Sequence, residues 1–88
     1  MRVEVCGKRW NLRIVPNLGP DGDCDKPSTR GKEIRIAARL AGVDQLDTLI
    51  HEMIHAGGWA TFDEAFVTHL AADIARVLWR LGYRKQDT

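Results

Sequence analysis

The sequence predicts an α+β fold, in which a small sheet from the first half of the chain packs against two helices from the second half. Three runs between residues 2 and 37 alternate polar and apolar side chains, as strands with one buried face do. Between residues 45 and 82, apolar side chains instead recur every three or four positions, the spacing of a helix. A chain of 88 residues has the size of one domain, so residues 1–88 are expected to form a single unit.

The predicted sheet has three strands and is of antiparallel type. Residues 2–6 and 10–15 alternate on either side of a short glycine-containing break, which predicts a β-hairpin. Residues 33–37 predict a third strand, expected beside the first helix, where it could hold an extended peptide by strand addition. Residues 16–32 contain all three prolines and are expected to form a loop.

Two helices are predicted after the sheet. The first covers residues 45–56, with Asp44 as its N-cap and Gly57-Gly58 as its end. The second covers residues 62–82 and is amphipathic. Its large apolar positions are Phe66, Leu70, Ile74, Val77, Leu78 and Leu81.

The first predicted helix contains the motif His51-Glu52-Met53-Ile54-His55. A helical turn takes about 3.6 residues, so the two histidines lie on one face and can reach the same metal ion. Glu52 lies beside them, where a base would stand to take a proton from a water at that metal. The helix keeps a separate apolar arc for the core, which favours a metal site over a polar face that is merely solvated.

A third ligand is expected downstream, because a catalytic zinc site takes three from the protein. The candidates are Asp63, Glu64, His69 and Asp73. Glu64 is favoured, since an acidic side chain at the start of the last helix projects from a rigid element towards the motif helix. Thr61 and Glu64 also have the spacing of a capping box, in which Glu64 would bond backbone N–H groups instead. Asp63 and His69 stay open as alternatives.

The charge balance and the hydropathy of the sequence bear on nucleic-acid binding, membrane association and cellular location. The chain has 13 Lys and Arg against 12 Asp and Glu, which gives no electrostatic indication of nucleic-acid binding. Neither a signal peptide nor a run of membrane-spanning length is recognised, so a cytoplasmic protein without a membrane partner is expected. Cys6 and Cys24 are then expected as reduced thiols, with a disulfide between them as the alternative.

The order of these features resembles the small zincin-like metallopeptidases encoded by bacteriophages and prophages. The resemblance rests on the His-Glu-x-x-His helix, on Trp59, on Asp63-Glu64-Ala65 and on the long last helix. In size the chain is also similar to minimal gluzincins, in which a second helix supplies a glutamate to the zinc. One departure is Thr68, where gluzincins often carry an aspartate that supports a histidine.

The resemblance implies a zinc-dependent metallopeptidase with a zincin-like fold. Its zinc ligands would be His51, His55 and Glu64, and Glu52 would be the general base for attack of a zinc-activated water on a peptide bond. The partner would be a peptide or protein substrate. The alternative is an accessory protein of a phage or prophage, which keeps the zinc for stability and binds another protein without catalysis.

Overall fold

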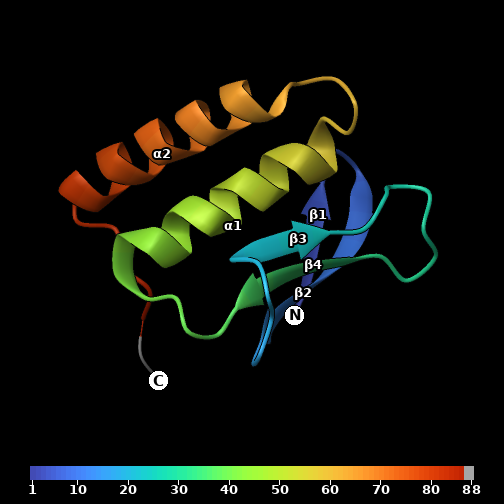
Figure 1. Cartoon of the computed structure of the whole chain (residues 1–88), viewed down its shortest axis with the longest axis horizontal. Coiled ribbons are helices and arrows are strands. Elements are labelled where there is room, and N and C mark those ends of the chain that lie inside the picture. Colours follow the sequence, from blue (N-terminus) through green and yellow to red (C-terminus); the bar gives the residue numbers. More distant parts are fainter. Residues whose placement is uncertain (87–88) are drawn as a thin grey trace.

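The computed structural model describes residues 1–86 and has an α+β fold, with one four-stranded mixed sheet and two helices (Figure 1). The predicted fold class is therefore confirmed, whereas the three-stranded antiparallel sheet is wrong. The elements form three layers. α1 (Gly42–Gly57) lies between the sheet and α2 (Glu64–Arg80), and α2 contacts no strand of the described chain.

The sheet has the strand order β1-β2-β4-β3. β1 (Arg2–Val5) and β2 (Lys8–Val15) form the predicted antiparallel hairpin. Its two turn residues, Cys6 and Gly7, have φ values of 49° and 77°. Two consecutive left-handed residues are what a type I′ turn requires, and this turn matches the twist of the strands that it joins.

The other half of the sheet differs from the prediction. β4 (Glu33–Ala37) pairs with β2 in parallel, because the intervening segment carries the chain back to the end of the sheet where β2 begins. Within that segment β3 (Gly22–Cys24) pairs antiparallel with the far side of β4. The strand expected to hold a peptide by strand addition is thus paired on both sides, and β3 is the edge strand on this side of the sheet.

The core lies between the sheet and α1, with a smaller buried seam between the two helices. Its buried residues are Trp10, Ile34 and Ile36 from the sheet and Ala56 from α1. On the helix side, α2 buries Val67, Ala71 and Ala75 against α1. Alanines at this seam let the two helix backbones approach closely. α1 is therefore packed on two sides, which leaves one polar face for the motif.

The ends of α1 depart slightly from the prediction. The helix begins at Gly42, and its N-cap Ala41 makes no side-chain hydrogen bond. Asp44 is therefore not the N-cap but lies in the first turn, where a negative charge interacts favourably with the helix dipole. The helix ends at Gly57 as expected. Neither helix within residues 1–86 combines the length and apolar character needed to cross a bilayer.

Candidate metal centre

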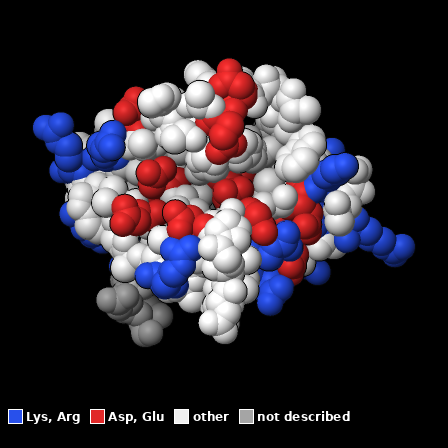
Figure 2. All heavy atoms as spheres, viewed as in Figure 1, with Lys and Arg blue, Asp and Glu red and all other residues white. Residues whose placement is uncertain are grey.

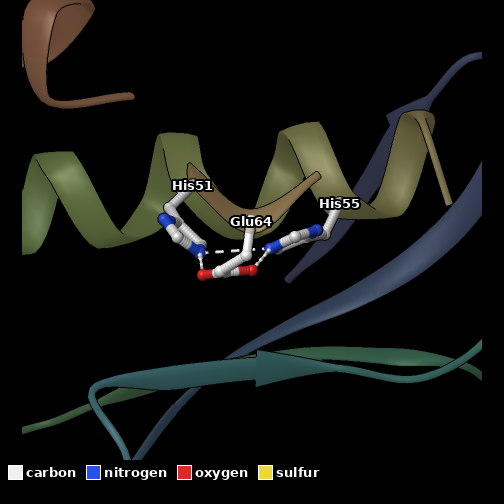
Figure 3. A group of neighbouring side chains, drawn as sticks. All are labelled: His51, His55 and Glu64. Carbon is white, nitrogen blue, oxygen red and sulfur yellow. Dashed lines mark hydrogen bonds and ion pairs between the residues drawn. The ribbon is translucent and has the colours of Figure 1, made fainter. Parts of the chain in front are cut away.

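Two histidines of α1 and one glutamate of α2 converge on the polar face of α1 (Figure 3). His51 and His55 come from successive turns, and their Nε2 atoms lie 3.1 Å apart. The Glu64 carboxylate bridges the pair, with Oε1 2.9 Å from His51 Nε2 and Oε2 2.8 Å from His55 Nε2. These are the three side chains that the resemblance implies as metal ligands, brought together from two helices.

The way in which α2 begins explains why the Glu64 side chain is free to contact the two histidines. The N-cap is Asp63, whose Oδ1 accepts a hydrogen bond from the Phe66 N–H at 2.7 Å. Because Asp63 caps the helix, the capping box of Thr61 and Glu64 does not form, and the Thr61 hydroxyl donates to the Trp59 carbonyl instead. The Glu64 side chain is left free to turn towards α1.

The remaining ligand candidates lie outside the cluster. Asp63 is engaged as the cap, Asp73 forms an ion pair within α2, and His69 is not among the converging side chains. Thr68, which stands where gluzincins often carry aspartate, donates its hydroxyl to Glu64 Oε1 at 3.5 Å. Thr68 thus supports the Glu64 carboxylate rather than a histidine.

The donor set suits a divalent ion of borderline softness. Two imidazole nitrogens and one carboxylate oxygen are ligands that zinc accepts. All three ligand atoms lie within 4.8 Å of one another. Zinc holds such atoms at about 2.0–2.2 Å. The two Nε2 atoms are 3.1 Å apart and lie 2.9 and 2.8 Å from the nearer Glu64 oxygens, separations that one ion at that distance can bridge.

Glu52, next to His51 in the motif, is the buried acid of the site. Its side chain is 7% exposed and no ion pair is formed with it within residues 1–86. Burial raises the pKa of Glu52 to about 7, and the negative charges of Asp23 and Glu64 add to the shift. A carboxylate with a pKa near neutrality can both accept and return a proton.

Gly22 in β3 holds the strand against Glu52. A Cβ atom at Gly22 would lie 2.7 Å from Thr48 Cγ2, closer than real Cβ atoms come to a neighbour, and 3.1 Å from Glu52 Cγ, a tight contact. The absence of a side chain at this position is what permits β3 to cover the acid. The sequence alone does not predict this role, because the Gly-Asp-Cys segment has little strand propensity and lies within residues 16–32, which predict a loop.

The cluster opens into a cleft of about 600 Å³ between α1, β3 and the start of α2. The acidic lining residues are Asp21, Asp23, Asp47, Glu52 and Glu64, and no Lys or Arg of the described chain lines it. Figure 2 shows acidic side chains gathered over the middle of this face. Two of the carboxylates are paired outside the cleft, Asp21 with Arg39 and Asp23 with Arg35.

The two cysteines of the described chain lie outside the group of converging candidate ligands. Cys6 and Cys24 are both free thiols rather than a disulfide. Cys24 lines the cleft, but burial raises its pKa to about 12, helped by the negative charge of Glu52. A thiol that keeps its proton is a poor metal ligand and a poor nucleophile.

Comparison of the chain with protein-family models, with curated proteins and with solved structures gives no match. The functional argument therefore depends on the residues of the site.

Proposed function

We propose that this protein is a zinc-dependent peptidase. The observation that carries the proposal is the convergence of His51, His55 and Glu64 beside the buried carboxyl of Glu52, all in one open cleft. Three protein ligands and a nearby base form the combination that metal-assisted hydrolysis requires.

The chemistry divides between the metal and Glu52. A zinc ion bound by the three side chains would supply a Lewis acid and a nucleophilic water at neutral pH. Glu52 accepts the proton that the water gives up and delivers it to the leaving amine. The burial that raises the Glu52 pKa to about 7 suits both steps, since the proton is held neither too tightly nor too loosely.

The free edge of β3 supports a peptide as the substrate. β3 pairs with β4 on one side only, and its residues Gly22, Asp23 and Cys24 all line the cleft. Unpaired backbone groups at a sheet edge bind an extended chain by strand addition. A peptide held this way passes in front of the metal ligands, with its backbone carbonyls available for attack.

A second function is a zinc-stabilised interaction protein without turnover. The composition of the cleft favours this alternative, because its lining within residues 1–86 includes no Tyr, no Arg and no third His. Those side chains are common donors to the oxyanion that forms during peptide hydrolysis. In this alternative the zinc would stabilise a small fold, as structural metals do.

Hydrolysis of a peptide library by the zinc-loaded protein separates the two functions. The peptidase proposal predicts cleavage that Glu52→Gln lowers by roughly 100-fold or more, the usual loss of a general base. Zinc content must be unchanged in this variant. No cleavage by fully loaded wild-type protein would favour the interaction protein, whereas cleavage that persists in Glu52→Gln would contradict the role of Glu52 as the base.

A further inference from the structure

The two ends of the cleft differ in chemistry along α1. Asp47, His51 and His55 are each separated by four positions, so they form one row on the face of α1 that lines the cleft. Trp59, 40% exposed, lines the cleft beyond the end of the same helix. The row therefore has a carboxylate at one end, the candidate metal ligands in the middle and an aromatic side chain at the other end.

Asp47 is an acidic side chain of the cleft without an ion-pair partner in the described chain. Asp21 and Asp23, by contrast, are paired with arginines outside the cleft, and Glu64 contacts the two histidines. Asp47 is partly buried, and no ion pair joins it to any residue in the range 1–86. Its negative charge is therefore available to a cationic group that enters the cleft.

Glu52 gives an independent indication that the cleft receives positive charge. Its side chain is 7% exposed, lines the cleft and has no ion-pair partner within residues 1–86. Burying a carboxylate without a partner costs free energy, and a cation brought in from solvent offsets that cost. The converging His51, His55 and Glu64 have the donors for one cation, and Asp47 is not among them. The Asp47 end of the cleft is thus left for a second positive group.

The position of β3 sets how far along a bound peptide this group would lie. A Cβ atom at Gly22 would meet both Thr48 and Glu52, so β3 runs beside the part of α1 that directly follows Asp47 (Figure 1). Along the helix axis, Asp47 is about 9 Å from the midpoint of the two histidines, at 1.5 Å per residue. An extended peptide advances about 3.3 Å per residue, so this distance corresponds to about three of its residues.

We propose that Asp47 is a specificity-determining residue, which selects peptides that carry a Lys or Arg about three residues from the peptide bond at the metal centre. The position of that bond rests on the proposed peptidase function, whereas the selection of charge by Asp47 does not require turnover. Trp59 at the opposite end of the cleft carries no charge, so the selection is confined to one side of the bond. No Lys or Arg among the described residues lines the cleft to compete with the peptide.

Peptide binding by the zinc-loaded Glu52→Gln protein tests the selection of charge without turnover. Fluorescein-labelled Ala/Ser peptides that carry one Lys, and a matched set that carries Gln instead, are titrated by fluorescence anisotropy. The Lys peptides should bind roughly 10-fold more tightly, as expected for one hydrogen bond between charged groups. Adding Asp47→Asn should reduce this ratio to about 2-fold or less. Adding Asp44→Asn, the matched control, should keep it, because Asp44 lies in the first turn of α1 and does not line the cleft.

Two results of the binding experiment would overturn the inference. One is equal binding of Lys and Gln peptides, or a ratio that Asp47→Asn leaves unchanged. The other is loss of zinc from Asp47→Asn, measured by elemental analysis, because Asp47 would then act through the metal centre rather than on the peptide.

Sequencing of the products from a peptide library tests the position of the basic residue. Bonds cleaved by the zinc-loaded wild type should have Lys or Arg enriched about three residues away, on one side only. In Asp47→Lys the enrichment should change to Asp or Glu at the same position. Cleavage without any enrichment would overturn the inference and leave the peptidase function standing. Selective binding of Lys peptides without cleavage would support the inference and contradict the peptidase function alone.

Discussion

Two polar clusters of this protein differ in how the negative charge of their carboxylates is balanced. Around Arg35, one guanidinium bonds the carboxylates of Asp23, Asp25 and Glu33, so the cluster contains its own cation. The metal-centre cluster brings two imidazoles and the Glu64 carboxylate together, and no Lys or Arg of the described chain lines that cleft. The first cluster is complete by itself, whereas the second has a donor set that could hold a cation and no cationic Lys or Arg beside it among the described residues.

The largest expected effect concerns zinc. An ion that binds only the folded state, at a free concentration of about 1,000 times its Kd, raises the free energy of unfolding by about 4 kcal/mol. We expect thermal unfolding followed by circular dichroism to show a much higher Tm with zinc than with a chelator. His55→Ala should lose this difference and Arg35→Met should keep it. Equal Tm values with and without zinc in the wild type would contradict the expectation that the His51–His55–Glu64 cluster binds an added cation.

The buried acid beside the metal-centre cluster, Glu52, and the carboxylates of the Arg35 cluster should give pH dependences of stability with opposite sign. Glu52 has a folded-state pKa of about 7 against 4.5 unfolded, so its contribution in metal-free protein is present below pH 4.5 and is lost as the pH rises towards 7. At about 1.4 kcal/mol per unit, the loss reaches roughly 3 kcal/mol. The pKa of Asp25 is lowered chiefly by its hydrogen bond from Arg35, so its contribution is lost as the pH falls below 3.8.

Urea denaturation of chelated protein between pH 4.5 and 7 measures the first of these effects. Wild-type stability should fall over this range more steeply than that of Glu52→Gln, which has no carboxylate to ionise. Parallel pH curves for the two proteins would mean that burial of Glu52 carries no electrostatic cost.

Removing the internal cation gives a smaller effect. Arg35→Met leaves Asp23, Asp25 and Glu33 close together without their common partner, and we expect a loss of about 2 kcal/mol, since the cluster is partly exposed. The loss should be the same with and without zinc. Arg39→Met is the control, because its pair with Asp21 is exposed and should contribute at most about 0.5 kcal/mol. Chemical denaturation measures the loss of unfolding free energy in both variants. Equal losses would mean that the Arg35 cluster stabilises the fold no more than the exposed Arg39 pair does.

The smallest expected effect concerns the cap that positions the metal-centre carboxylate. Asp63→Ala removes the side-chain bond to the Phe66 N–H and should cost about 1 kcal/mol, the usual value of an N-cap. Zinc affinity should also fall, because Glu64 is the next residue. Asp44→Ala is the matched control, since Asp44 lies in a first turn without capping it. Calorimetric zinc titration should show an unchanged Kd for this control.

The features that follow from local patterns are the ones that the sequence predicts well. The spacing of apolar residues and the turn residues predict the hairpin, the strand at residues 33–37 and both helices. The pairing of His51 with His55 follows from helical spacing alone, and Glu64 lies with them in the structure.

The features that depend on distant contacts are missed. The parallel pairing of β4 with β2 depends on the path of residues 16–32, which no local pattern specifies. β3 is held by pairing to β4 and by the bonds of Arg35 to Asp23 and Asp25, and these partners are far apart in sequence. For the same reason the close approach of Gly22 to Glu52 can be seen only in three dimensions.

The most direct test of the metal centre is the zinc content of the purified protein, measured by elemental analysis after incubation with a small excess of zinc and desalting. About one zinc per chain is expected for the wild type, as for a single three-ligand site. Glu64→Ala and His55→Ala should each retain far less, while Arg35→Met retains the full amount. A wild type without zinc, or ligand variants that hold as much as the wild type, would contradict the proposed site.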